Sequence, residues 1–144
     1  MKILVSIVII IAGSFTWQAQ DELSWKMMAD IKYEQRLHPE LEEELEYPIF
    51  STQTLELKGK EVVVEGFAVR TSDSGLLSEI IITKDPIIWG SCSSLPKPHE
   101  AVQAFMKTPT AYTKEKISIK GRLALNLEDL DKLIYILEDA EVME

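Results

Sequence analysis

Residues 117–125 read Ile-Ser-Ile-Lys-Gly-Arg-Leu-Ala-Leu and residues 62–69 read Val-Val-Val-Glu-Gly-Phe-Ala-Val, so both stretches are centred on a glycine. In each stretch, β-branched residues lie two and four positions before the glycine, and a charged residue directly precedes it. Alternation with a period of two predicts a strand that buries one face. A glycine inside such a strand is typical of a bulge, or of the bend by which a small sheet curls on itself. The two stretches therefore predict a small closed or half-closed barrel.

The rest of the chain supplies further strands for this barrel. The segment from His99 to Lys107 fits either a helix or a strand, because its apolar residues match both periods. If it is a strand, the count reaches five, which suits an OB-like barrel. We therefore expect a mainly β fold, a small OB-like five-stranded barrel with a short N-terminal helical arm. The clear strands are expected at 61–70, 77–83, 116–126 and 133–142.

The N-terminus has the pattern of a secretory signal peptide. Lys2 is followed by an apolar run from Ile3 to Phe15, and Ala19 lies just before the chain turns polar. The run is shorter than the roughly 20 residues that span a bilayer. We expect a signal peptide at 1–20, an N-terminal arm at 21–48 and the barrel domain at 49–144. The expected location is periplasmic or secreted, and an uncleaved membrane anchor is the alternative.

The arm is expected to be helical and to pack against the barrel. Ser24 can cap a short helical turn that carries Trp25 on one face. The leucines that follow are four residues apart among glutamates, which predicts an exposed helix from Glu40 to Glu46. Tyr47-Pro48 would end it, because a residue before proline avoids helical angles. We expect Trp25 and these leucines to contact the barrel.

The charge of the chain argues against a nucleic-acid partner. The formal net charge is −9, whereas proteins that bind single strands need a basic groove. A small basic stripe of Lys116, Lys120 and Arg122, with Lys114, is expected to meet either an anionic ligand or the acidic arm. We expect no cofactor and no nucleic acid. The expected partner is an envelope protein or a small ligand, with membrane attachment only through an uncleaved signal.

The connection from Trp89 to Pro98 is the candidate site, together with His99. Trp89, Ser91, Cys92 and His99 are the candidate ligand-binding residues, because function usually lies on loops held by a rigid scaffold. Cys92 is the only cysteine, so it is a buried small residue, a free thiol or half of an intermolecular bond. Cys92 and His99 could also form a thiol–base pair or soft metal ligands. No phosphate loop or His-Glu-x-x-His motif is present. We expect a non-enzymatic ligand- or protein-binding module, or alternatively a metal- or thiol-dependent envelope protein.

The order of motifs resembles a family of small exported bacterial proteins of a domain-of-unknown-function type, found in Bacteroidetes and Proteobacteria. The matching features are Trp25, Tyr47-Pro48, the run 57–67, a cysteine after the second strand, the strand 119–123 and the ending 135–142. The resemblance implies an OB-like barrel in which Ala101–Lys107 is a strand. Relatives often carry a second cysteine or a histidine beside the first. Here Ser93-Ser94 follow Cys92, so that pair has no counterpart.

Overall fold

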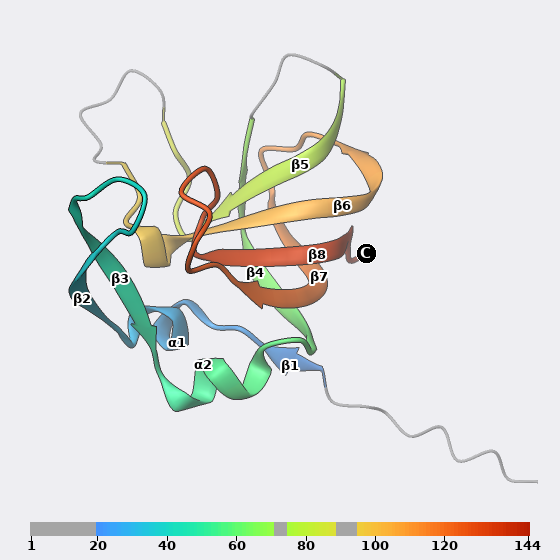
Figure 1. The fold of residues 1–144 in the computed structure, drawn as a ribbon. Coiled ribbons are helices and arrows are strands. Elements are labelled where there is room, and N and C mark those ends of the chain that lie inside the picture. Colours follow the sequence, from blue (N-terminus) through green and yellow to red (C-terminus); the bar gives the residue numbers. More distant parts are fainter. Residues whose placement is uncertain (1–19, 71–74, 89–94) are drawn as a thin grey trace, which may run out of the picture.

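Five strands close into a barrel. The computed structural model describes residues 20–70, 75–88 and 95–144. The barrel has the strand order β4-β5-β6-β8-β7, and β7 pairs back onto β4. β6 and β8 run parallel, and the other barrel pairs are antiparallel (Figure 1). This closed arrangement confirms the mainly β, OB-like five-stranded barrel. The strands are β4 (Glu61–Val69), β5 (Leu76–Thr83), β6 (Ala101–Ala111), β7 (Lys116–Leu125) and β8 (Tyr135–Val142).

The segment that fits both a helix and a strand in the sequence is a strand. A single 3-10 turn, η1 (Pro98–Glu100), precedes it, and β6 follows directly. β6 lies between β5 and β8, so its backbone groups find hydrogen-bonding partners on both sides. Val102 and Ala104 are fully buried in the core, and Gln103 between them lies on the opposite face. Partners on both sides therefore decide in favour of the strand.

Gly66 lies where β4 is too crowded for a side chain. A Cβ atom at Gly66 would lie 2.5 Å from the carbonyl oxygen of Thr83 and 2.6 Å from Cγ2 of Ile82. β4 changes partners here, because it pairs with β7 up to Phe67 and with β5 from Phe67 onward. Trp25 of the arm packs at the same place, 3.0 Å from the Cβ position. The glycine thus permits the close approach at which β4 passes from β7 to β5.

Gly121 lies at a bulge between β7 and β8. Lys120 pairs with Glu141 and Arg122 pairs with Glu138, so two residues of β8 lie opposite Gly121 and the extra residue belongs to β8. A Cβ atom there would lie 3.0 Å from Cβ of Leu137 and 3.1 Å from the carbonyl oxygen of Glu138. The bulge therefore lies in β8 and not, as the sequence suggested, in the glycine-centred strand, and Gly121 leaves room for it with a looser contact than at Gly66.

The N-terminal arm docks against the barrel through short elements. Residues Asp21–Glu22 form β1, which adds to β4 in parallel, and Trp25–Ala29 form α1. The Ser24 hydroxyl accepts a hydrogen bond from the Met27 amide and caps α1, as the sequence predicts. The Trp25 indole N–H donates to the carbonyl oxygen of Glu65 at 2.8 Å. The expected contact of Trp25 with the barrel is confirmed.

The expected helix from Glu40 to Glu46 is wrong. The segment belongs to a hairpin in which β2 (Ile31–Leu37) pairs in register with β3 (Glu44–Phe50). Nδ1 of His38 accepts hydrogen bonds from the amides of Glu40 and Leu41 and organises the turn. A seven-residue helix is marginal in water without packing, whereas the hairpin pairs every residue of both strands. Leu37 and Leu41 are 66% and 50% exposed, so these leucines do not pack on the barrel.

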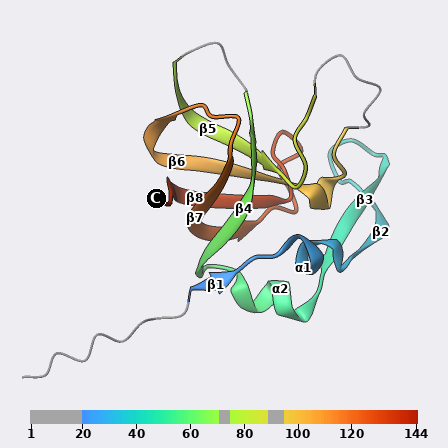
Figure 2. The same cartoon turned by 180° about the vertical axis from the view of Figure 1, so that it is seen from behind.

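A second short helix completes the arm. α2 (Thr52–Leu57) follows β3 directly, and the Ser51 hydroxyl accepts from the Thr54 amide at its N-terminus. The helix has no counterpart among the sequence expectations. In both views the arm helices and β1 lie together below the barrel, with the hairpin along one side (Figures 1 and 2).

A buried tyrosine joins the arm to the barrel. Tyr135 of β8 is fully buried, and its hydroxyl donates to the carbonyl oxygen of Met28 in α1 at 2.9 Å. The ring of Phe50 contacts it edge to face, with centroids 5.5 Å apart. Burial, with the nearby Tyr33 and Asp30, raises the pKa of the Tyr135 phenol above its usual range. The core therefore extends from the barrel into the arm.

The basic stripe pairs within the barrel and not with the arm. Lys116 lies 3.3 Å from Glu65, and Lys120 lies 3.6 Å from Glu141. The guanidinium of Arg122 binds Glu138 at 2.9 Å. The expectation that this stripe meets the acidic arm is therefore wrong. The register of the strands places acidic residues of β4 and β8 next to β7, which a linear pattern of charges does not show.

The expected signal peptide lies outside the described residues, apart from its last position, Gln20. In the part of the chain that the structure describes, none of the helices is long and apolar enough to cross a membrane.

We expect Gly66→Ala to lower the free energy of unfolding by about 3 kcal/mol, because a Cβ placed against backbone cannot be relieved by rotating a side chain. Gly75→Ala is the matched control, since no atom of the described residues beyond its chain neighbours lies within 4 Å of its Cβ position. Its effect should stay within about 0.5 kcal/mol. Urea unfolding followed by tryptophan fluorescence measures both variants. Equal losses in the two would contradict the close approach at Gly66.

We expect Tyr135→Phe to lower the free energy of unfolding by about 1–2 kcal/mol at pH 7, because the buried carbonyl of Met28 loses its donor. The raised pKa also predicts a pH dependence. The unfolded chain releases the phenol proton near the ordinary value of 10.0, below the pKa in the folded protein, so this stabilisation falls as the pH rises above 10.

Tyr135→Phe should therefore flatten the alkaline decline in stability. Tyr47→Phe is the control, because the Tyr47 ring is only half-buried. Its hydroxyl forms no hydrogen bond with residues 20–70, 75–88 or 95–144. Urea titrations at pH 7 and above pH 10 measure the slope. An unchanged slope in Tyr135→Phe would refute the buried-phenol explanation.

Candidate functional site

Of the four ligand-binding residues expected from the sequence, the structure describes only His99. Trp89, Ser91 and Cys92 lie in 89–94, outside the described residues. His99 lies in η1, half-buried, and η1 packs against α1. Its Nδ1 is buried and has no hydrogen-bond partner among the described groups. Within the described residues, no cluster of three or more His, Cys, Asp or Glu side chains could hold a metal ion.

An apolar cavity lies on the outer face of the barrel beside this connection. We call it the slot; its volume is about 390 Å³. Strand alternation explains its floor, because Ile80 and Ile82 point into the core while Ile81 and Thr83 lie on the outer face. The slot is lined by Val69, Ile81, Thr83, Ile87, Leu95, Pro96, Lys97, Pro98, Ala101, Lys132, Leu133 and Ile134.

One wall of the slot is the β5–β6 connection, whose two ends are tied together. The Lys84 amide donates to the carbonyl oxygen of Glu100 at 3.1 Å. The Glu100 carboxylate accepts from the Lys97 amide at 3.1 Å, and the Glu100 amide donates to the Lys97 carbonyl at 2.8 Å. The Thr83 hydroxyl donates to the carbonyl oxygen of Asp85 at 2.8 Å. These bonds hold the described ends of the connection over the outer face of β5.

The other wall is the β7–β8 loop, residues 126–134, which Asn126 organises. The Asn126 amide group donates to the carbonyl oxygens of Asp129, Lys132 and Leu133, at 2.6, 3.2 and 3.3 Å. Its side-chain oxygen accepts from the amides of Glu128 and Asp129. One side chain thereby closes the loop upon itself. The lining contributed by both loops places them side by side at one end of the barrel (Figure 1).

Gln103 fastens this loop to the barrel. It lies on the outer face of β6 and is only 7% exposed. Its side-chain oxygen accepts from the Leu133 amide at 2.9 Å, and its nitrogen donates to the Glu79 carboxylate at 2.7 Å. Loss of either hydrogen bond would leave a buried polar group without a partner, which lowers stability. Leu133 and the neighbouring Ile134 are thus held at the edge of the slot.

The charged groups of the slot lining are two lysines. Lys132 binds Asp129 at 2.9 Å. This bond raises the pKa of Lys132 and, together with a bond from the Asp131 amide, lowers that of Asp129, so the pair stays ionised around neutral pH. Lys97 makes no ion pair with a described residue. The lining therefore contains one paired and one unpaired ammonium group.

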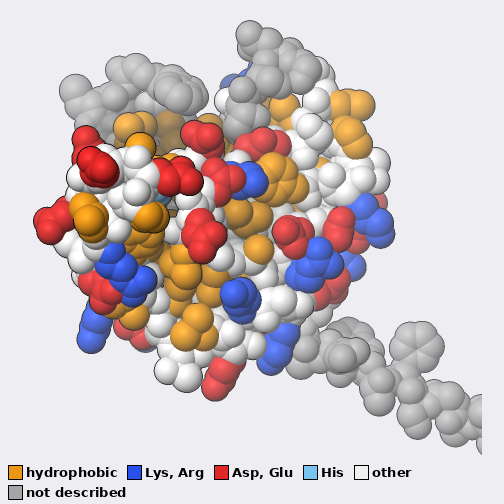
Figure 3. Space-filling view, viewed as in Figure 1, with side chains coloured by type: hydrophobic (Ala, Val, Ile, Leu, Met, Phe, Trp, Pro, Cys, Tyr) orange, Lys and Arg blue, Asp and Glu red, His pale blue; other side chains and the backbone are white. Residues whose placement is uncertain are grey.

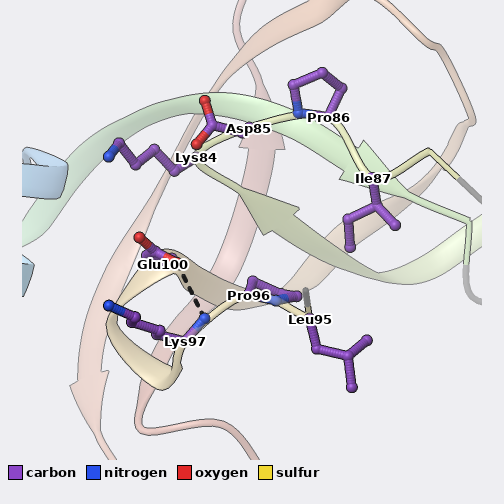
Figure 4. A pocket seen from close by; sticks show the side chains of 8 residues that line it. All are labelled: Lys84, Asp85, Pro86, Ile87, Leu95, Pro96, Lys97 and Glu100. Atoms are coloured by element: carbon purple, nitrogen blue, oxygen red, sulfur yellow. Dashed lines mark hydrogen bonds between the residues drawn. The ribbon is translucent and has the colours of Figure 1, made fainter. Parts of the chain in front are cut away.

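A second hollow of about 350 Å³ adjoins the slot and shares four lining residues with it, Ile87, Leu95, Pro96 and Lys97. In Figure 4 the side chains of Lys84 and Lys97 extend to one side, whereas those of Ile87 and Leu95 point to the other. The dashed line in that view is the bond from the Lys97 amide to Glu100. The hollow thus has a polar end and an apolar end, and Lys97 lies where the two cavities meet.

Several residues of the site are not predicted from the sequence. Lys97 belongs to the expected connection but not to the expected candidates, and Asn126 and Gln103 lie far from it in the chain. One signal was available: Asn126 begins the run Asn-Leu-Glu-Asp, and asparagine side chains often bond to the backbone two or three residues on. The lone glutamine among apolar residues of β6 is a second signal.

Comparisons of the whole chain with protein-family models, with curated proteins and with solved structures find no significant match.

We expect Asn126→Ala to loosen the β7–β8 loop and to lower the free energy of unfolding by about 1–2 kcal/mol, because up to five hydrogen bonds are lost at a partly exposed site. Hydrogen exchange at the Glu128 and Asp129 amides should become faster. Asn126→Asp is the matched control, since it keeps the oxygen that accepts from these amides. Unchanged exchange in Asn126→Ala would show that the loop does not depend on this side chain.

Proposed function

We propose that the protein is an exported, non-enzymatic binding module that holds a small apolar ligand in the slot. The observation that carries this proposal is the slot itself. Its volume of about 390 Å³ lies within the range of roughly 300–1,000 Å³ typical of small-molecule sites. Most of its lining is aliphatic or proline, and both walls are held by hydrogen bonds to the barrel or within the loops. Such a preformed apolar cavity favours binding.

The chemistry of the lining supports binding over catalysis. Among the described lining residues, the polar side chains are Thr83, Lys97 and Lys132. Thr83 is 1% exposed, and its hydroxyl bonds to the carbonyl oxygens of Asp85 and Phe67. An acid–base or nucleophilic mechanism needs a group within reach of the ligand and a partner to activate it. The two ammonium groups suit orientation of a ligand better than proton transfer.

The N-terminal sequence supports export. A basic start, an apolar run from Ile3 to Phe15 and the small residue Ala19 favour a secretory signal and a periplasmic or secreted location. The net charge of −9 disfavours nucleic acid as the partner. Acidic and basic side chains are interspersed over the face shown in Figure 3, with hydrophobic side chains between them. The described part of that face has no broad basic surface.

The test is a titration of the purified protein with 1-N-phenylnaphthylamine, a neutral dye that fluoresces in apolar surroundings. We expect saturable binding of one dye per chain. Leu95→Asp, at the wall of the slot, should weaken it by at least about tenfold, because the dye would then contact a carboxylate that needs water. Leu130→Asp is the matched control, since Leu130 is also largely exposed but does not line the slot.

Leu95 is 80% exposed, so the variant should fold normally. Ile81→Asp on the floor provides a second variant, checked by its circular dichroism spectrum. Absence of saturable binding, or equal binding by Leu95→Asp and Leu130→Asp, would overturn the proposal.

A second candidate function is a metal- or thiol-dependent role through Cys92 and His99. One observation favours it: Nδ1 of His99 is buried and has no hydrogen-bond partner among the described groups, which leaves a lone pair or a proton for a further contact. Metal analysis of the same purified protein distinguishes the candidates. Stoichiometric zinc that disappears in Cys92→Ser would favour the second candidate over the apolar ligand.

A further inference from the structure

The slot is unlike a purely hydrophobic pocket, because its charged groups all have one sign. Lys97 and Lys132 line it, and no carboxylate does so among its described lining residues. In a chain of net charge −9, this local excess of positive charge requires an explanation. A ligand with an apolar body alone would gain nothing from it.

Lys97 is the better placed of the two lysines for contact with a ligand. Lys132 already binds Asp129 at 2.9 Å, whereas the Lys97 ammonium has no ion pair with a described residue. Its backbone is fixed on both sides by Glu100, which accepts from its amide and donates to its carbonyl. The backbone of Lys97 is therefore held in place, while its ammonium forms no ion pair with a described residue.

The position of Lys97 between the two cavities also favours contact with a ligand. Lys97, Leu95 and Pro96 line both cavities, so Lys97 stands at the junction of the apolar slot and the hollow with the polar end. Figure 4 shows its side chain extending away from Leu95 and Ile87, toward the side on which Lys84 lies. A ligand with its chain among the aliphatic residues would thus place its end group near an ammonium.

The acidic groups of this region lie outside the lining of the slot. Asp85 and Glu100 line the second hollow but not the slot. The Glu100 carboxylate is engaged by the Lys97 amide, and Asp129 is engaged by Lys132. In the second hollow Lys84 and Lys97 are matched by Asp85 and Glu100, so the excess of positive charge among the described lining residues belongs to the slot.

We propose that the slot binds a single-chain amphiphile with a free carboxylate, its alkyl chain lying between the two loops and its head group contacting Lys97. This inference rests on the proposed function and adds the chemical class of the ligand. Burial of the chain provides affinity in proportion to its length, and the ammonium selects the sign of the head group. The contact is partly exposed, so its effect on affinity is modest and sensitive to salt.

The experiment is competition against bound 1-N-phenylnaphthylamine with dodecanoate, dodecanol and dodecyltrimethylammonium, each below its critical micelle concentration. These probes share one chain and differ in head-group charge. We expect dodecanoate to bind about two- to fivefold tighter than dodecanol, and the cation to bind most weakly. Decanoate should bind more weakly than dodecanoate by about fourfold per methylene removed.

Lys97→Gln should abolish the preference for dodecanoate over dodecanol, so that the two probes displace the dye at similar concentrations. Lys58→Gln makes the same change of charge on the exposed end of α2, away from the slot, and should keep the preference. Raising the salt concentration should reduce the preference in the wild type. Because Lys97 is exposed and its backbone makes the structural bonds, the substitution should not impair folding.

The outcomes separate this inference from the function on which it rests. If no probe displaces the dye and the dye does not bind at the slot, both proposals fail. If dodecanol competes as well as dodecanoate, the binding function stands and the carboxylate assignment is overturned. A preference for dodecanoate that persists in Lys97→Gln would overturn the assignment of the head-group contact.

Discussion

The structure depends on the close contact at Gly66, where three segments of the chain meet. The backbone of β4 passes so near the Thr83 carbonyl and the Ile82 side chain that a methyl group would not fit. This approach lets β4 leave β7 and pair with β5, which closes the barrel. The arm uses the same place, since the Trp25 ring packs beside Gly66 and its N–H donates to the neighbouring carbonyl of Glu65. A single missing side chain thus serves both closure of the sheet and docking of the arm.

Closure of the sheet determines where cavities can form. The interior is filled by side chains such as Val64, Ile80 and Tyr135, all of them buried, so available cavities lie on the outer face and between loops. Apolar residues on the outer face of a barrel form a cavity only if neighbouring loops enclose them. Here the two walls come from the β5–β6 and β7–β8 connections, and side-chain amides hold the second wall. Asn126 shapes that loop and Gln103 fastens it, so the slot is built by polar residues that do not line it.

The periodicity of the sequence was sufficient for the barrel and insufficient for the arm and the site. Strands with one buried face leave a period-two pattern, and the glycines at 66 and 121 mark real irregularities. The leucines and glutamates near residue 40 matched a helix by spacing, yet the pairing of β2 with β3 provided more backbone partners. In the connection after β5, Leu95, Pro96 and Lys97 line the slot, whereas Trp89, Ser91 and Cys92 lie outside the described residues. His99, in contrast, lies in η1 against α1. Asn126, Gln103 and Lys132 join the site from other strands and loops, and no local pattern brings them together.

The sequence by itself determined the class of fold, because alternation of buried and exposed residues and glycine-centred strands are local patterns that can be detected along the chain. It also determined the sign of the net charge, and with it the kinds of partner that are disfavoured. Only the tertiary structure decided which strands became neighbours, which cations found acidic partners on β4 and β8, and which stayed unpaired. It also decided that Ile81 of β5, Leu133 of the β7–β8 loop and Lys97 before β6 share one cavity. The physical reason is that burial of one face of a strand depends only on the spacing of residues along the chain. Contact between residues far apart in sequence depends on the order and register of the strands in the closed sheet.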